Sequence, residues 1–344
     1  MSKQQMKAIG LLEYLPVDQP ESLLDVLIDK PEPTGKDLLI RVKAISVNPV
    51  DVKVRAPKNK TENTPKILGW DVAGIVEQAG PEASLFKPGD EVYYAGSIAR
   101  PGGNSEFHLV DERIVGFKPA TLEFAHAAAL PLTAITAWEG LFDRLGVSPH
   151  TEHNEGKTIL IIGAAGGVGS IATQLAKHAG LTVIGTASRP ESAEWATNMG
   201  ADHIINHYEA FLPQLEALGL ATVDYIFCLN STDTHWMNMA ETIAPQGKIC
   251  SIVETDAPLN LTLLKNKSVT FVWELMFTRP LFQTPDLIEQ HKLLNEVSRM
   301  IDKGSLRTTV AQILSPINAA NLRKAHGLLE EGRMIGKIVV ENFK

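Results

Sequence analysis

The chain is poor in cysteine and has no long apolar run. Only two of its 344 residues are cysteines, Cys228 and Cys250, and both lie in apolar segments typical of buried strands. Two cysteines cannot build a four-cysteine zinc lobe, and buried thiols are typical of a reducing cytoplasm. The N-terminal residues lack the apolar core of a signal peptide, and no apolar run reaches the ~20 residues of a membrane span. We therefore expect a cytoplasmic protein with no membrane partner.

Runs of basic residues are also missing. The formal net charge is −8, and no cluster of Lys and Arg stands out, so nucleic acid is excluded as a partner. Repeats and low-complexity tracts are absent as well. Hydrophobic residues make up 44% of the chain, which is enough for sizeable cores, and the length suggests two domains.

Residues 1 to about 130 are predicted to be mostly β structure. Short apolar runs alternate with Pro and Gly clusters, at Lys7–Tyr14, Ser22–Ile28, Asp37–Val47, Gly74–Gln78 and Glu91–Ala95. Many short strands indicate a small barrel or sandwich. The polar, aperiodic segment Arg55–Lys66 is predicted to be a surface loop. Helical spacing of apolar residues then begins in Ala125–Leu145.

From Lys157 onward, strand-like and helix-like segments alternate, which predicts a parallel, doubly wound sheet. Its last strand is expected at Ser268–Phe277, and the elements after it are expected to return to the first domain. The fold class is therefore α/β. The predicted domains are residues 1–130, residues 131–278, and residues 279–344 as the return to the first domain.

A glycine-rich stretch, GAAGGVGS, lies between the apolar strand Lys157–Ile162 and an amphipathic helix. Gly163, Gly166 and Gly169 are three residues apart. This spacing permits a tight turn, lets the backbone approach a pyrophosphate, and allows close packing of helix on strand. Free N–H groups around Gly167 and Val168 would face the phosphates. A P-loop is disfavoured because no Lys-Ser/Thr pair follows. The pattern predicts a dinucleotide site.

The end of the next strand indicates which dinucleotide binds. NAD sites carry an acidic residue there, about 20 residues after the glycines. Here the strand ends in Ser188 and Arg189. A hydroxyl and a guanidinium suit the extra phosphate of NADP, which a carboxylate would repel. We therefore predict NADP(H); the alternative is that Arg189 is only a solvated residue at the start of a helix.

Several stretches together resemble the medium-chain dehydrogenase/reductase superfamily, most closely its zinc-free, quinone oxidoreductase-like branch. They include AISVNPVDVKVR, PKILGWDVAGIVEQAG, ILIIGAAGGVGSIATQLAK, MGADHIIN and GKIVVE. The resemblance implies a β-rich, GroES-like catalytic domain with an inserted Rossmann domain. It also implies that Thr136 lies beside the nicotinamide. Relatives use a Tyr after the Ile-Asn pair for the NADP phosphate, where this chain has His207 and then Tyr208.

The zinc-binding members of this superfamily hold the metal with two Cys and one His. The corresponding positions here are Asn48, Trp70 and about Leu132. An amide, an indole and an alkyl chain are not zinc ligands. The resemblance, with these departures, predicts that the protein binds no metal.

The predicted activity is NADPH-dependent transfer of hydride to a quinone or a conjugated enal or enone. Such acceptors spread the incoming negative charge and need no strong Lewis acid. Asn48 is the candidate polar contact at the reaction centre and also a candidate cofactor contact. Lys53 is a second catalytic candidate, and Trp70 is a candidate pocket wall. Two alternatives stay open: a non-catalytic NADPH-binding protein, such as a redox sensor or structural protein, and a zinc-dependent alcohol dehydrogenase.

The chain is also predicted to form a homodimer. Ser268–Phe277 is apolar and would lie at the edge of the sheet, where an unpaired strand invites association. In relatives, two such strands pair across a two-fold axis. The alternative is that the C-terminal elements cover this edge within one chain.

Overall fold

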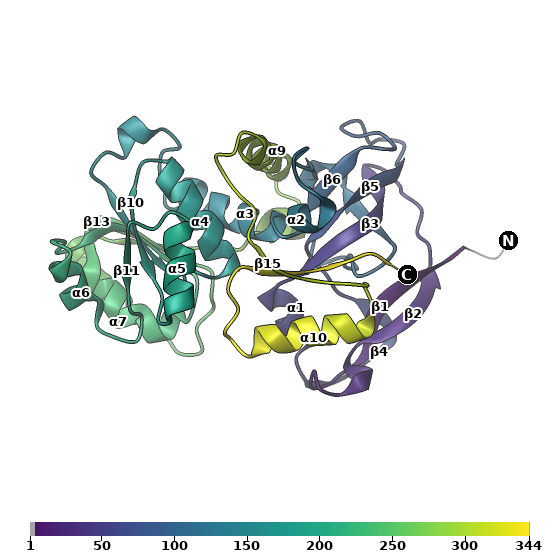
Figure 1. Ribbon diagram of the computed structural model, residues 1–344, viewed down its shortest axis with the longest axis horizontal. Helices are drawn as coiled ribbons and strands as arrows, with labels where there is room; N and C mark the ends of the chain where they lie inside the picture. Colours follow the sequence, from purple (N-terminus) through teal and green to yellow (C-terminus); the bar gives the residue numbers. More distant parts are fainter. Residues whose placement is uncertain (1–3, 344) are drawn as a thin grey trace. The chain divides into compact units, whose positions relative to one another are not determined.

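The computed structural model describes residues 4–343 and divides into two compact units. Unit 1 contains the residues up to Leu132 together with those from Phe277 onward, and unit 2 is Thr133–Met276. The two predicted domain boundaries, at 130/131 and 278/279, each lie two residues from the corresponding boundary between the units. Figure 1 shows the C-terminal helix and strands in yellow among the purple N-terminal strands of unit 1.

Unit 1 is built on two sheets. The smaller one is antiparallel, in the order β2-β1-β4, from β1 (Gln5–Tyr14), β2 (Leu24–Asp29) and β4 (Lys58–Ile67). The larger one has the order β15-β16-β3-β5-β6-β8, with β7 also paired to β3. Its strands are β3 (Asp37–Val47), β5 (Val72–Ala79), β6 (Glu91–Tyr94), β7 (Phe107–Asp111), β8 (Gly116–Phe117), β15 (Val310–Leu314) and β16 (Lys337–Glu341). The pairing of β16 with β3 joins a C-terminal strand to an N-terminal one in the same sheet.

The predicted surface loop Arg55–Lys66 is wrong, because most of it forms β4. Strand β4 pairs with β1 through Gly10↔Ile67 and Tyr14↔Lys58, with irregular register between them. It is an edge strand and largely exposed, so its composition is polar and shows no two-residue apolar alternation. Pattern reading failed here because an exposed edge strand is held by backbone hydrogen bonds rather than by a buried face.

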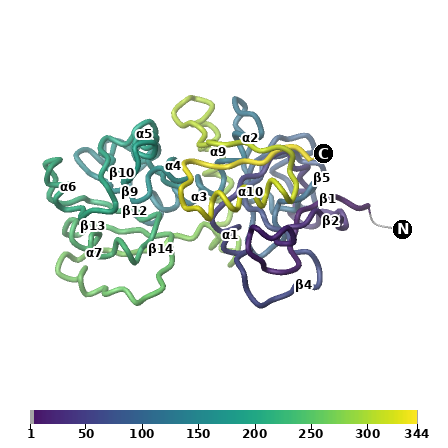
Figure 2. The backbone as a smooth tube through the Cα atoms, turned by 60° about the horizontal axis from the view of Figure 1, so that its bottom comes forward, coloured from purple at the N-terminus to yellow at the C-terminus, as the bar shows by residue number. Residues whose placement is uncertain are grey.

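Helices of unit 1 pack around the sheets. They are α1 (Pro49–Arg55), α2 (Phe124–Ala128), α8 (Thr278–Phe282), α9 (Glu289–Asp302) and α10 (Ala319–Glu330), with short 3-10 turns at Pro20–Ser22 and Glu112–Ile114. Helices α1 and α10 are in contact and lie side by side in Figures 1 and 2. Buried Arg55 of α1 bonds to His326 and Glu330 of α10. The C-terminal helix therefore supports α1, whose first residues belong to the site described below.

Unit 2 is a six-stranded, all-parallel sheet in the order β11-β10-β9-β12-β13-β14. This is the strand order of the doubly wound dinucleotide-binding fold. The strands are β9 (Thr158–Ile162), β10 (Thr182–Thr186), β11 (His203–Ile205), β12 (Val223–Cys228), β13 (Ile243–Ser251) and β14 (Thr270–Trp273). All five residues of β9 are buried, as the apolar run KTILII predicted for a central parallel strand. The predicted fold class is confirmed.

The helices of unit 2 alternate with its strands. They are α3 (Pro131–Trp138), which begins at the end of unit 1, α4 (Gly167–His178), α5 (Pro190–Asn198), α6 (Phe211–Ala217) and α7 (Thr232–Thr242). A π-helical turn covers Glu139–Arg144, and 3-10 turns cover Thr151–His153 and Leu261–Lys267. The helical segment expected over Ala125–Leu145 is therefore divided between α2, α3 and the π-helical turn, with Pro131 at the start of α3.

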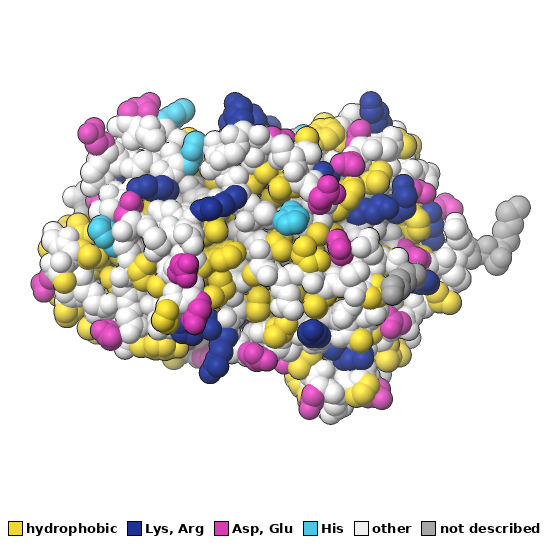
Figure 3. All heavy atoms as spheres, viewed as in Figure 1, with side chains coloured by type: hydrophobic (Ala, Val, Ile, Leu, Met, Phe, Trp, Pro, Cys, Tyr) yellow, Lys and Arg dark blue, Asp and Glu magenta, His cyan; other side chains and the backbone are white. Residues whose placement is uncertain are grey.

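The last strand of unit 2 is shorter than predicted. The expected Ser268–Phe277 strand is reduced to β14, four residues long, although it does lie at the edge of the sheet. Trp273 and Leu275 are about half exposed. Within residues 4–343 no helix is long and apolar enough to cross a membrane. On the face drawn in Figure 3, acidic and basic side chains are interspersed.

Candidate functional site

The glycine turn of unit 2 lies directly after the central strand β9. Gly163 has φ +87°, a backbone conformation that side chains other than glycine rarely adopt. A Cβ atom on Gly169 would lie 2.2 Å from the carbonyl oxygen of Gly163, so no larger residue fits there. A Cβ atom on Gly166 would lie 3.5 Å from the same carbonyl oxygen, which is an ordinary contact. Backbone conformation therefore requires glycine at position 163 and packing requires it at position 169, while Gly166 leaves the turn open to a ligand.

The turn is placed where a doubly wound sheet binds its ligand. Strand β9 lies between β10 and β12, the point at which the strand order reverses. Helix α4 begins at Gly167, so the first N–H groups of the helix, including that of Val168, have no partner within it. The N–H of Gly163 donates to Thr186 Oγ1 at 3.0 Å and ties the turn to β10. These features fit the pyrophosphate of a dinucleotide, which the turn and the helix N-terminus would hold.

The residues predicted to bind the NADP phosphate lie near one another at the ends of β10 and β11. Ser188 and Arg189 follow β10 and are half-buried, whereas Tyr208 is 82% exposed. Burial, and then the charge of Arg189, lower the pKa of His207. The rings of His207 and Tyr208 are 4.6 Å apart. A cation, a hydroxyl, an imidazole and a phenol are thus gathered in one place, which fits a phosphate group.

His235 of α7 belongs to the same group and was missed by the sequence reading. Its ring centroid is 6.2 Å from that of His207, and it stacks on Phe211. Burial lowers its pKa to about 4, so the imidazole is neutral near pH 7. Its Nδ1 atom is buried and has no hydrogen-bond partner in the fold. His235 is almost 30 residues from His207 in sequence, and only the fold brings them together.

In unit 1, the start of α1 is fixed by a buried carboxylate. Asn48 precedes the helix and Pro49 opens it. Asp51 accepts hydrogen bonds from the N–H of Asn48 at 2.8 Å and the N–H of Gly69 at 3.0 Å. Burial raises the pKa of Asp51 to about 7. Asp51 therefore fixes the backbone at the start of α1 and at Gly69.

A second buried carboxylate joins all three positions at which zinc members of the superfamily would place their ligands. Asp71 Oδ2 accepts from the Asn48 side-chain nitrogen at 2.8 Å, and Asp71 Oδ1 accepts from the N–H of Leu132 at 2.8 Å. Trp70, at the remaining position, is the neighbour of Asp71 in the chain. Asp71 is completely buried, and burial raises its pKa.

The charge of Asp71 is balanced by Lys337 of β16. The ammonium is 3.1 Å from Asp71 Oδ2, donates to the carbonyl oxygen of Val47 at 2.9 Å, and also donates to Asn48 Oδ1. Lys337 is 4% exposed. An ammonium has three donors, and here each has an acceptor. The opposite charge of Lys337 acts against the burial effect on the pKa of Asp71.

The other predicted residues of this site lie around the network. The Trp70 ring is buried, packs edge-on against Phe277 with centroids 6.3 Å apart, and donates its N–H to the carbonyl oxygen of Ser97 at 3.2 Å. Its only polar group is therefore occupied. Lys53 is exposed on α1. Thr136 is buried on α3 in unit 2.

The residues present do not fit a catalytic zinc ion. An amide, an indole and an alkyl side chain stand at the three ligand positions, and the adjacent carboxylate is engaged by Lys337. Among the described residues, no three His, Cys, Asp or Glu side chains are grouped so as to hold a metal ion. A dication would also meet the Lys337 ammonium at close range.

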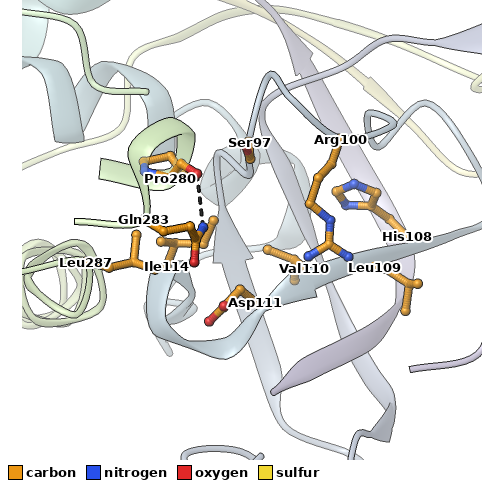
Figure 4. A pocket seen from close by; sticks show the side chains of 10 residues that line it. All are labelled: Ser97, Arg100, His108, Leu109, Val110, Asp111, Ile114, Pro280, Gln283 and Leu287. Carbon is orange, nitrogen blue, oxygen red and sulfur yellow. Dashed lines mark hydrogen bonds between the residues drawn. The ribbon is translucent and has the colours of Figure 1, made fainter. Parts of the chain in front are cut away.

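A small pocket elsewhere in unit 1 is lined by Ser97, Arg100, His108, Leu109, Val110, Asp111, Ile114, Pro280, Gln283 and Leu287 (Figure 4). Arg100 is held by both oxygens of Asp37, at 2.7 and 2.8 Å. Burial lowers the pKa of His108 to about 4, and its ring nitrogens bond to Tyr94 and Pro101. Because its charged and titratable groups already have partners, we assign this pocket no ligand.

Two family descriptions match the chain. Residues 34–131 match the alcohol dehydrogenase GroES-like domain, and residues 199–340 match a zinc-binding dehydrogenase. A zinc-type alcohol dehydrogenase-like protein of Staphylococcus aureus strain MSSA476 is 47% identical over 335 residues, which cover 97% of this chain and 99% of the relative. The chain belongs to the medium-chain dehydrogenase/reductase superfamily. It is therefore a nucleotide-binding oxidoreductase, as the resemblance implied.

Solved structures support this assignment. A putative zinc-dependent alcohol dehydrogenase from Rhizobium etli CFN 42 is 53% identical, with a TM-score of 0.94 and complete coverage of both chains. The quinone oxidoreductase from Coxiella burnetii is 28% identical, with a TM-score of 0.79 over 99% of this chain and 100% of that one. The names of two of these relatives mention zinc. In this chain, however, the three ligand positions carry an amide, an indole and an alkyl side chain, which are not zinc ligands.

Asp71 and Lys337 lie within stretches that resemble the superfamily, but the local sequence around them predicts a role for neither. One signal was available. Lys337 is the first residue of the apolar C-terminal strand, and a lysine that is buried there requires a partner of opposite charge. The partner itself, 266 positions earlier in the chain, could not be identified from spacing.

Proposed function

We propose that the protein transfers hydride from NADPH to a quinone or to a conjugated enal or enone, without zinc. The observation that carries the proposal is the Asn48–Asp71–Lys337 network, which stands at the ligand positions of the zinc enzymes. Oxidation of a simple alcohol must stabilise an alkoxide, which zinc does as a Lewis acid. A neutral, internally paired network cannot lower the pKa of an alcohol in that way. The similarity to a quinone oxidoreductase supports the same conclusion.

Conjugated acceptors suit this site because their charge spreads as hydride arrives. A ring or an enone delocalises the developing negative charge, so modest hydrogen bonding suffices at its oxygen. Orientation against the nicotinamide, which supplies the hydride when the cofactor is bound, then accounts for much of the rate. The buried indole of Trp70 offers a flat apolar wall for such an acceptor.

Asn48 is the proposed donor to the acceptor oxygen. Its Nδ2 atom carries two hydrogens, of which Asp71 takes one. The second is the hydrogen that would be donated to substrate. Lys53, exposed on the same helix, is a weaker candidate for binding the acceptor. The network offers no other side-chain donor, because the Lys337 ammonium has three acceptors within it.

NADPH is the proposed cofactor. Gly163, Gly166 and Gly169 would hold the pyrophosphate, with the N–H groups of Gly167 and Val168. Ser188, Arg189, His207 and Tyr208 would hold the extra phosphate, and Thr136 would lie beside the nicotinamide. Burial, and then the charge of Arg189, lower the pKa of His207. The positive charge of Arg189 beside this imidazole supports the binding of an anion here.

The activity is tested with ethanol, a simple enal and a small benzoquinone under one set of conditions. We expect NADPH oxidation with the enal or the quinone and little NADP reduction with ethanol. Fast ethanol oxidation with the other two inert would show that the proposed function is wrong. If all three are inert while NADPH binds, the non-catalytic alternative is favoured. Asn48→Ala should lower turnover with the enal more than it weakens NADPH binding.

A homodimer is proposed as the working form. Strand β14 is the edge of the parallel sheet and carries partly exposed Trp273, followed by exposed Leu275. Such an edge is suited to pairing with a second copy across a two-fold axis. Light scattering at micromolar concentration should give twice the monomer mass, and a monomeric mass would contradict the proposal.

A further inference from the structure

The Lys337 ammonium distinguishes the two ends of the Asn48 amide. It donates to Asn48 Oδ1, while Asn48 Nδ2 donates to Asp71 at 2.8 Å. If the amide were flipped, its nitrogen would face the ammonium and its oxygen would face the carboxylate. The amide nitrogen would then meet a second donor, and the amide oxygen would meet a second acceptor. Neither hydrogen bond could form, which is costly inside a buried site. The cation and the anion therefore allow a single orientation of the amide.

The same two charges hold one another in place. Lys337 comes from β16, at the end of the chain, and Asp71 comes from the residues just before β5. Both are almost completely buried, so neither charge can be satisfied by water. Removal of the ammonium would leave Asp71 without its balancing charge, and Asn48 Oδ1 without the donor that fixes it.

We propose that Lys337 is a positioning residue for the reaction: by holding Asn48 Oδ1 beside Asp71, it directs the second Nδ2 hydrogen of Asn48 toward the acceptor oxygen. The inference rests on the proposed function, since it needs Asn48 to be the donor. It goes beyond that function by assigning the orientation of the donor to a lysine almost 290 residues away in the chain. A fixed cation thus supports the donor at a site where related enzymes use a metal.

The test is a double-mutant cycle with Lys337→Met and Asn48→Ala, measured as kcat and KM with a simple enal and NADPH. Methionine keeps the side chain up to the Cε position and removes the charged nitrogen with its three donors. We expect Lys337→Met to lower kcat by about tenfold or more, with the KM for NADPH unchanged. If Lys337 acts through Asn48, the double variant is no slower than Asn48→Ala alone.

Lys118→Met is the matched control. Lys118 lies in the same unit, its side chain is 5% exposed, and it pairs with Glu91 at 3.1 Å. It has no contact with the Asn48 network among its hydrogen bonds, which go to the carbonyl oxygens of Pro119 and Leu122. We expect Lys118→Met to keep the kcat of the unaltered protein. Its loss of stability calibrates the loss caused by removing a buried lysine.

The outcomes separate the two proposals. If Asn48→Ala lowers kcat and Lys337→Met does not, the role of Lys337 is wrong and the proposed function stands. If the losses of the two single variants add up in the double variant, Lys337 does not act through Asn48 and the inference is overturned. If Asn48→Ala leaves kcat unchanged, the proposed donor is wrong. Should Lys337→Met not fold, Lys337→Gln, which keeps a donor for Asn48 Oδ1, takes its place in the cycle and is expected to lose less kcat than Asn48→Ala.

Discussion

The glycine turn of unit 2 and the polar network of unit 1 are built in opposite ways. The turn is made of backbone: glycines, a helix start and one threonine hydroxyl, all within 24 residues of sequence. The network is centred on the side chains of Asn48, Asp71 and Lys337, and with the N–H of Leu132 it joins three distant parts of the chain. A backbone site tolerates change in its surroundings but not at its glycines. A side-chain site depends on each partner being present, because its members are buried and charged.

The largest effect is expected from Asp71→Ala. It would remove the acceptor of the Asn48 amide and the Leu132 N–H, and the counter-charge of Lys337. Loss of one partner of a buried ion pair costs about 3–5 kcal/mol. Denaturant unfolding should show a decrease in this range. Glu289→Ala is the control, because its pair with Lys292 is exposed on α9 and should contribute no more than ~1 kcal/mol. Similar losses for the two variants would mean that the network is not a structural unit.

A binding effect of smaller size is expected from Arg189→Ala. A charge-assisted hydrogen bond contributes about 1.5–3 kcal/mol. NADPH should therefore bind roughly tenfold more weakly or worse, while NADH binding barely changes. Titration of both cofactors against both proteins measures this. Equal weakening for the two cofactors would show that Arg189 does not contact the extra phosphate.

The backbone site is tested with Gly169→Ala. The added Cβ would lie 2.2 Å from the Gly163 carbonyl oxygen, so the turn or α4 must move, at a cost of about 1–3 kcal/mol. Both unfolding stability and dinucleotide binding should fall. Gly327→Ala in α10 is the matched control, since its Cβ would meet only a Val17 methyl at 3.9 Å. A helical glycine with that much space should be neutral or stabilising when replaced. A stable, NADPH-binding Gly169→Ala protein would contradict the assigned role of the turn.

The last effect is a pH dependence that comes from Asp51, and it is measured as a slope rather than as a single loss of stability. Its pKa is raised to about 7 in the fold, against about 4 in an unfolded chain. Between these values the folded form binds more protons, so stability is lost as pH rises from about 4 to about 7, by at most ~1.4 kcal/mol per pH unit. Above the folded pKa this loss is complete.

Asp51→Asn cannot titrate and should lack this slope, although it gives up one of two acceptor oxygens. Free energies of unfolding for both proteins at several pH values between 5 and 8 measure the difference. As pH rises, the free energy of unfolding of Asp51→Asn should increase relative to that of the unaltered protein, so the gap between the two should change. A constant gap would show that Asp51 stays ionised throughout.

Some strands and some site residues could be predicted from the sequence, and others could not. Strand β9 was predicted because burial on both faces leaves a continuous apolar run. Strand β4 was missed because its residues face solvent, and the hydrogen bonds to β1 leave no trace in composition. The glycines, Ser188 and Arg189 follow strands directly, so their places could be read from their neighbours. His235 could not, because α7 lies far from them in sequence.

The sequence by itself determined the α/β class, the alternation of strands and helices in unit 2, the dinucleotide turn, and the replacement of the zinc ligands by Asn48, Trp70 and Leu132. The strand–helix alternation and the dinucleotide turn depend on residues within about 30 positions of one another, where spacing and side-chain chemistry act locally. The replaced zinc ligands were identified one position at a time, each from a short stretch that resembles the superfamily. Only the tertiary structure decided what stands in the place of those ligands. Lys337 meets Asp71 and Asn48 because β16 pairs with β3, and the position of a charge across a sheet depends on strand register, which no local pattern encodes.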